Sequence, residues 1–242
     1  MRKTLLLAVL IVSGIAILVS AGILTYYWMQ DRSDERVREA VSALRPEENT
    51  EPDEAFADLL AANPETIGWL RIDGTSVDGV VMYAPYEEDK YLHLDFFGNY
   101  SARGTYYLEE QCDVRTSDNL IIYGHHMKDG TMFGALVAYQ DPQFAFAHPT
   151  IRFHTLYGDY TYEIVATINT RVLEDYEPGF KYYQYTGSGD TEQFQAYQAF
   201  IESNRLYDTG VTLQPGDRLI TLSTCAYHTA NGRFILVGRQ IS

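Results

Sequence analysis

The sequence has little cysteine and few basic residues, and both shortages narrow the range of proteins that it can encode. Only Cys112 and Cys225 occur among 242 residues, so no disulfide framework holds the fold together, although one bridge between the two stays possible. Lys and Arg number 18 against 33 Asp and Glu, which gives a formal net charge of -15. Nucleic-acid binders have an excess of basic residues because they neutralise phosphates. DNA and RNA are therefore excluded as partners.

Charged residues are also absent between Leu5 and Met29. This stretch is long enough to cross a bilayer, which takes about 20 apolar residues, and the Tyr26-Tyr27-Trp28 run near its end is typical of a membrane interface. A cleaved signal peptide is the alternative, because Val19-Ser20-Ala21 resembles a cleavage site. We expect a short cytoplasmic N-terminus at 1–4, a transmembrane anchor at 5–29, and a single-pass membrane protein whose remaining chain is extracellular.

The chain beyond the anchor divides into a spacer and one folded domain. Residues 30–52 are strongly charged, with Val37, Val41 and Leu44 at helical spacing, and predict a stalk helix followed by a linker. The remaining 53–242 suit one domain, and a content of 46% hydrophobic and 14% aromatic residues is ample for a core. No internal repeat or low-complexity segment is evident.

The folded domain is expected to be mainly β. A short helix is expected at 53–62, and the turn dipeptides Asp73-Gly74 and Gly158-Asp159 are flanked by strand-like runs. A helix interrupts the later strands, because Asp190-Thr191-Glu192-Gln193 resembles an N-cap with a Gln that reaches back, and Phe194, Tyr197 and Ile201 then recur at helical spacing. Many short strands predict a barrel or sandwich. The expected strands are 68–72, 77–83, 104–108, 119–123, 151–157, 160–166, 218–224 and 233–241.

Cys225 ends a strand-like run, where a rigid support would expose its thiol. The alternative is a buried small hydrophobic residue, which is the commoner fate of a lone cysteine. Arg233 opens the next apolar strand after a turn at Asn231-Gly232. Neighbouring strands would bring its permanent charge close to Cys225, where it can favour a thiolate or bind a developing oxyanion.

His125 follows the strand predicted at 119–123, so a second titratable side chain lies at a strand exit. Imidazole is the usual acid/base partner of a catalytic thiol because its charge changes near neutral pH. A metal site at His125 and His126 is disfavoured, since adjacent residues rarely point to one ion, and we expect no metal or cofactor. His228 is a minor candidate because it is close to Cys225 in the sequence. Structural or surface roles are expected for His93, His148 and His154.

Three segments in this order resemble the His, TLxTC and Arg signatures of the sortase family. They are Tyr123-Gly124-His125, Thr221-Leu222-Ser223-Thr224-Cys225, and Arg233. The segment 63–70, Tyr91-Leu92 ahead of Gly104, the segment 124–133 and the helix before the Cys strand are similar to class B sortases. The resemblance covers essentially everything from Asp53 onward and is specific.

The resemblance implies a closed eight-stranded sortase-type β-barrel with an N-terminal helix and a helix inserted before the Cys-bearing strand. It also implies a cysteine transpeptidase that cleaves a C-terminal sorting signal of secreted proteins after Thr, through a thioester on Cys225. The acceptor would be an amine of a peptidoglycan cross-bridge or its lipid-linked precursor in a Gram-positive cell wall. His125 and Arg233 would complete the catalytic set. Leu92, Ser223 and Thr224 would bind the sorting signal.

Several alternatives remain. Within the family, a pilin-polymerising enzyme is the nearest. Cysteine L,D-transpeptidases and papain-like peptidases also pair Cys with His, but in different local contexts and with no counterpart of Arg233. A membrane-tethered β-domain that only binds partners is the non-enzymatic reading, and a Cys225→Ala protein with full cellular function would favour it.

Overall fold

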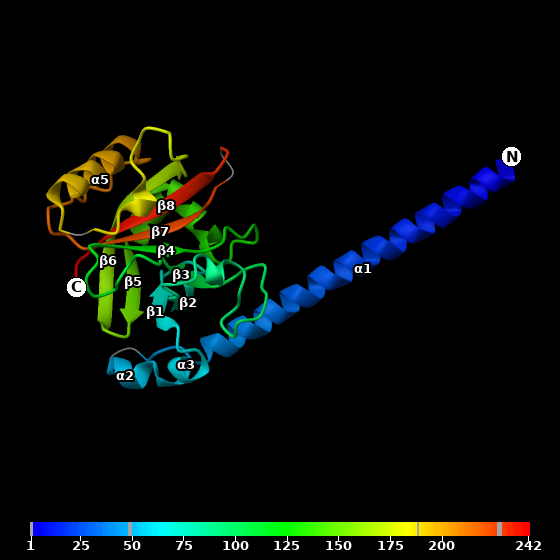
Figure 1. Cartoon of the computed structure of the whole chain (residues 1–242), viewed down its shortest axis with the longest axis horizontal. Coiled ribbons are helices and arrows are strands. Elements are labelled where there is room, and N and C mark those ends of the chain that lie inside the picture. Colours follow the sequence, from blue (N-terminus) through cyan, green and yellow to red (C-terminus); the bar gives the residue numbers. More distant parts are fainter. Residues whose placement is uncertain (1, 48–49, 188, 227–228) are drawn as a thin grey trace. The chain divides into compact units, whose positions relative to one another are not determined.

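The computed structural model describes residues 2–47, 50–187, 189–226 and 229–242 (Figure 1). It divides into two units, one ending at Ala40 and the other running from Val41 to Ser242. Helix α1 (Arg2–Ser42) is continuous, so the predicted apolar helix and the stalk helix are one element. Within the described residues it alone is long and apolar enough to cross a membrane, with a mean hydropathy of 2.7 in its most apolar window. A signal sequence has these same properties.

The second unit is built on a closed barrel of eight strands, as predicted. The order around the barrel is β1-β2-β3-β4-β7-β8-β6-β5. Two neighbouring pairs, β2 with β3 and β4 with β7, are parallel, and the other pairs are antiparallel. The strands are β1 (Thr66–Arg71), β2 (Asp78–Met82), β3 (Tyr106–Leu108), β4 (Asn119–Tyr123), β5 (Thr150–Thr155), β6 (Gly158–Arg171), β7 (Leu219–Cys225) and β8 (Gly232–Gln240).

Strands β7 and β8 are buried on both faces because alternate side chains enter two different cores. On β8, Phe234 and Leu236 pack in the main core, whereas Ile235 and Val237 pack in a second cluster with Tyr197. The same alternation on β7 sends Ile220 and Leu222 to the main core and Leu219 to the second cluster. This explains why both strands appear in the sequence as nearly continuous apolar runs rather than alternating ones.

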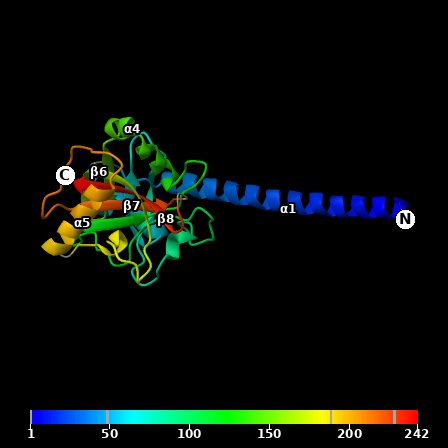
Figure 2. The ribbon, with the colours of Figure 1, turned by 90° about the horizontal axis from the view of Figure 1, so that it is seen from above.

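Helix α5 (Thr191–Asn204) covers the second cluster from outside the barrel (Figure 1 and Figure 2). The Asp190 carboxylate caps its N-terminus by accepting hydrogen bonds from the backbone N–H groups of Glu192 and Gln193, as the sequence predicts. Tyr197 also forms a hydrogen bond with the Thr221 hydroxyl of β7, at 2.7 Å. The other helices are α2 (Pro52–Ala55), α3 (Ala57–Ala62), α4 (Pro142–Ala147), and the 3-10 helices η1 (Lys90–Leu92), η2 (Phe133–Gln140) and η3 (Tyr182–Gln184).

Some boundaries differ from prediction for local reasons. The second hairpin turns at 156–157 rather than at Gly158-Asp159, because Thr155 already pairs with Gly158, and the Thr155 hydroxyl accepts from the Tyr157 N–H. The predicted helix at 53–62 is divided at Phe56, whose side chain is fully buried and whose φ of -100° and ψ of 2° end α2. Asp73-Gly74 does form the first turn, with Gly74 at a φ of +79°.

Gly104 departs from the strand predicted at 104–108 and fixes η1 in place. Its φ is +59°, a left-handed conformation that excludes it from a strand, so β3 begins only at Tyr106. A Cβ atom at Gly104 would lie 2.4 Å from the Leu92 carbonyl oxygen and 2.6 Å from that of Tyr91. Only glycine therefore lets this loop approach η1 closely, and η1 contains Leu92, which lies at the candidate site described next.

Candidate active site

Cys225 is the last residue of β7, and its side chain is exposed. By alternation along β7 it lies on the same face as Ser223 and Thr221, outside the barrel core and beyond the region that α5 covers. The structure therefore contradicts the alternative reading of Cys225 as a buried small residue. No disulfide joins it to Cys112, and both thiols are free.

Arg233 is the direct partner of Cys225 in the antiparallel ladder between β7 and β8. Opposite residues in such a pair have Cβ atoms about 4.5–5.5 Å apart and side chains on one face. The guanidinium is half-buried, and its Nη1 donates a 3.0 Å hydrogen bond to the Gly232 carbonyl. The backbone thus places Arg233 directly across the ladder from Cys225, as the turn at Asn231-Gly232 predicts.

The parallel pairing of β4 with β7 places His125 at the same end of the barrel. Tyr123 is the partner of Ser223 in the last pair of this ladder, so His125 follows β4 by two residues just as Cys225 follows Ser223 on β7. The His125 Nε2 lies 2.7 Å from the Leu92 carbonyl oxygen. A carbonyl can only accept, so Nε2 carries the hydrogen and the neutral ring keeps Nδ1 as its basic nitrogen.

Burial is the main cause that lowers the pKa of His125 below its ordinary value. The hydrogen bond to Leu92 works against this, and the nearby His93 ring adds to it. The His93 and His125 ring centroids are 5.3 Å apart, and His93 also stacks on Tyr100. Sequence reasoning gave His93 only a structural or surface role, and no spacing in the sequence indicates this contact.

Ser223 and Thr224 are both buried, with 1% and 2% of their surface exposed. The Thr224 hydroxyl donates to the Gly124 carbonyl at 2.7 Å, and the Ser223 hydroxyl forms a 2.9 Å hydrogen bond with the Tyr182 hydroxyl. Both hydroxyls are thus engaged within the protein. The substrate-binding role expected for these two residues and for Leu92, which is half-buried, stays a prediction.

Tyr182 on η3 is a member of this site that sequence reasoning missed. Burial raises its pKa to about 12, against the opposing effects of the Ser223 hydrogen bond and the Arg233 charge. The phenol is therefore neutral at physiological pH and forms its hydrogen bond with β7 at Ser223, two residues before Cys225. Tyr182 lies in a tyrosine-rich segment with no motif, so only the folded chain reveals its position.

Of the other candidates, His126 contacts the backbone of Cys225, whereas Cys112 is buried in the main core. His126 Nδ1 lies 2.9 Å from the Cys225 carbonyl oxygen, and His228 lies outside the described residues. Cys112 is 1% exposed, and burial raises its pKa to about 12. Across the described part of the chain, no three His, Cys, Asp or Glu side chains are grouped so that they could hold a metal ion.

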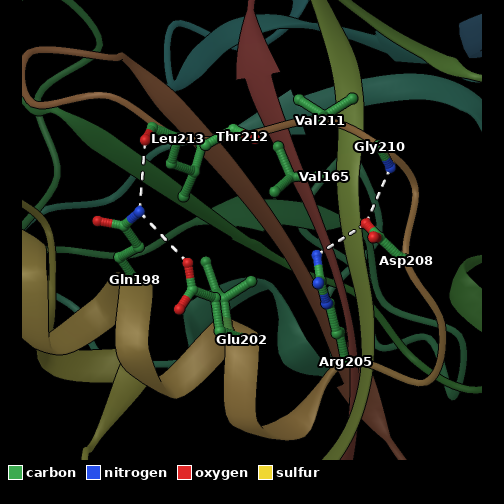
Figure 3. Close-up of a pocket in the computed structure, with 10 residues that line it drawn as sticks. Val165, Gln198, Glu202, Arg205, Asp208, Gly210, Val211, Thr212 and Leu213 are labelled. Carbon is green, nitrogen blue, oxygen red and sulfur yellow. Dashed lines mark hydrogen bonds and ion pairs between the residues drawn. The ribbon is translucent and has the colours of Figure 1, made fainter.

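A separate cavity of about 150 Å³ lies between α5, β6 and the segment that follows α5 (Figure 3). The polar side chains of this cavity bond to one another. Arg205 forms an ion pair with Asp208 at 2.9 Å, and the Gln198 amide donates a hydrogen bond to Glu202 at 3.4 Å. Val165 on its wall lies next to Ala166, and Ala166 is the partner of Val237 on β8. Val237 is four residues from Arg233 along that strand. That corresponds to about 13 Å of strand, so this cavity is distinct from the cysteine site.

Comparison with known proteins gives one consistent family. A family model described as "Sortase domain" matches residues 70–241. A protein named Sortase B from Listeria monocytogenes is 32% identical over 197 residues, covering 80% of this chain and 77% of that protein. Sortase B from Staphylococcus aureus is 29% identical over 192 residues, covering 77% and 74%. The crystal structure of sortase B from B. anthracis in complex with AAEK1 has a TM-score of 0.76 and 26% identity, covering 89% of this chain and 99% of that one.

Proposed function

The chain belongs to the sortase family as a class B cysteine transpeptidase. From this premise we propose that Cys225 is the nucleophile, that His125 is the general acid and base, and that Arg233 stabilises the negative charge that develops on the substrate carbonyl oxygen. The observation that supports this assignment is the ladder β4-β7-β8, whose register brings these three positions to one end of three adjacent strands. Sortases act on proteins that bear sorting signals and on cell-wall amines. For this chain we propose cleavage after the Thr of a C-terminal signal.

The reaction proceeds in two halves. In the first, Nδ1 of the neutral His125 takes the proton of the Cys225 thiol, the sulfur forms a bond to the Thr carbonyl carbon, and the C–N bond breaks as His125 passes that proton to the departing amine. In the second, an acceptor amine forms the new C–N bond and gives its proton to His125, and the C–S bond breaks as His125 returns the proton to the Cys225 sulfur. Arg233 donates hydrogen bonds to the carbonyl oxygen as it becomes negative in each half. The peptidoglycan cross-bridge or its lipid-linked precursor supplies the amine.

Helix α1 completes the proposal as a membrane anchor that holds the catalytic unit outside the cell. Its uncharged stretch and the aromatic residues at its end support an anchor over a cleaved signal. An enzyme fixed at the membrane surface would meet secreted proteins as they emerge.

The test is detection of the acyl-enzyme by mass spectrometry, after incubation with a library of Thr-containing sorting peptides. Cys225→Ala removes the only atom that can hold the acyl group, so both the thioester and all cleavage should vanish. His125→Ala should lose turnover in both halves. Arg233→Lys keeps the charge but loses the planar fork, so a large loss of kcat would indicate directed hydrogen bonds. An active His125→Ala protein beside an inactive His126→Ala protein would show that the wrong histidine is assigned.

A further inference from the structure

We propose that His126 is a positioning residue for the nucleophile, whose imidazole holds the backbone of Cys225 by continuing the β4–β7 ladder beyond the end of β4. The proposal rests on the assignment of Cys225 as the nucleophile. It gives the second histidine of the Gly124-His125-His126 run a role that is separate from proton transfer.

The register of the two parallel strands shows which hydrogen bond the imidazole replaces. The last backbone rung runs from the Gly124 N–H to the Ser223 carbonyl, at 3.3 Å. In a parallel ladder the rungs repeat every two residues, so the next rung joins the His126 N–H to the Cys225 carbonyl. The structure instead has the His126 side chain at that carbonyl, with Nδ1 2.9 Å from the oxygen.

A side-chain donor also occupies the intermediate position. The same ladder pattern assigns the Gly124 carbonyl to the backbone N–H of Cys225, and the Thr224 hydroxyl donates to this carbonyl at 2.7 Å. One donor on β7 and one on the segment that follows β4 therefore reach across the gap beyond the end of β4. Together they link the Gly124–His126 segment to the end of β7.

The loop that contains His126 is itself closed, so the imidazole is not mobile on a free tip. His126 and Met132 form an isolated antiparallel bridge, and the Phe133 N–H donates to the His125 carbonyl at 3.0 Å. Asp129 within the loop forms an ion pair with Arg103 at 2.7 Å. A donor on a fixed loop loses little entropy when it holds the Cys225 carbonyl, which favours a positioning role.

The chemistry of the contact separates positioning from acid/base catalysis. A backbone carbonyl can only accept, so the His126 Nδ1 must carry its hydrogen to make this contact. Asparagine can present an amide N–H at almost the place of Nδ1 and cannot transfer protons near neutral pH. His126→Asn should therefore keep the function, whereas His126→Ala should lose it.

The experiment uses the full chain in detergent and measures kcat and KM with the peptide from the sorting-peptide library that wild type cleaves fastest. His126→Ala should lower kcat about tenfold with KM unchanged, the factor that corresponds to one net hydrogen bond, and His126→Asn should stay within about threefold of wild type. His148→Ala is the matched control, because it removes another half-buried imidazole, on the segment that ends α4. It should leave kcat unchanged.

A second readout is the rate at which iodoacetamide alkylates Cys225, followed by peptide mass spectrometry. It should change in His126→Ala and return to the wild-type rate in His126→Asn. If His126→Ala does not fold, His126→Leu lacks the donor and takes its place. An Asn variant as impaired as the Ala variant, or an Ala variant equal to wild type in both readouts, overturns the proposal. Cleavage that survives Cys225→Ala overturns the assignment of the nucleophile instead, whatever the His126 variants do.

Discussion

Replacing Thr224 with valine tests whether the hydroxyl that joins β7 to the His125 loop is needed for catalysis. Valine keeps a branched side chain but cannot donate to the Gly124 carbonyl, and both residues are buried. A buried carbonyl left without its donor costs about 1–3 kcal/mol. In a domain of this size each kcal/mol lowers Tm by about 2–4 °C. Because Gly124 directly precedes His125, we also expect kcat to fall.

Thr155→Val is the matched control. Thr155 is fully buried, and its hydroxyl donates to the Gly158 carbonyl at 3.0 Å and accepts from the Tyr157 N–H at 3.0 Å, so its replacement removes at least as many hydrogen bonds. Thr170 on β6 is the partner of Arg233, and Gly158 lies twelve residues from Thr170 along the same strand. Twelve residues correspond to about 40 Å of strand, so Thr155 is far from the candidate site. Both variants should melt at lower temperature, but only Thr224→Val should lose activity.

The kinetic pattern separates positioning from substrate binding. If Thr224 holds the His125 loop, kcat falls while KM stays near its wild-type value. A raised KM with unchanged kcat would mean that Thr224 contributes to ground-state binding of the sorting signal. Equal activity of Thr224→Val and Thr155→Val would refute the reasoning, because loss of the hydrogen bond would then matter only for stability.

Three further predictions concern the thiols, the pH dependence and the membrane topology. Cys112→Ser should retain transpeptidation, and alkylation of the native enzyme at neutral pH should modify Cys225 and spare Cys112; a disulfide between them in active enzyme would contradict this. An NMR titration should find the His125 pKa below about 6.5. The contribution of neutral His125 to the free energy of unfolding is therefore present above about pH 6.5 and declines as the pH falls toward the lowered pKa. His93→Asn should raise this pKa, and an unchanged value would remove His93 as a cause. Protease added to intact cells should degrade the catalytic unit, and a protected unit, or a soluble protein starting near Gly22, would argue against an extracellular anchored enzyme.

The sequence predicted the strands of the site better than the contacts between them. Asn119–Tyr123 was located to the residue because an apolar run ends at a glycine, and Asp190 was identified from its capping pattern. Strand β6 was predicted too short, since its second half reads Thr-Ile-Asn-Thr-Arg, with polar residues that are paired to β8 across the ladder. Burial of these residues depends on a neighbour that is distant in the sequence.

The hydrogen bond from His125 to Leu92 shows why the rest could not be predicted. Its acceptor is a backbone carbonyl 33 residues away, and every residue has such a group, so the identity of Leu92 contains no signal for it. The sequence indicated Leu92 only through family resemblance. The close approach of Gly104 to η1, which fixes that carbonyl, depends on backbone conformation that only the folded chain specifies.

The parallel pairing of β4 with β7 also determines when the site can form during folding. The contact between Gly124 and Thr224 spans 100 residues, whereas an antiparallel hairpin would bring partners together across a short turn. Long-range pairing of this kind is slow because the loop-closure entropy is lost before the contact is gained. A chain synthesised from its N-terminus contains His125 long before Cys225. The proposed nucleophile therefore joins the segment that contains His125 only after β7 has been synthesised and has paired with β4, so a chain that has not completed this pairing lacks the proposed site.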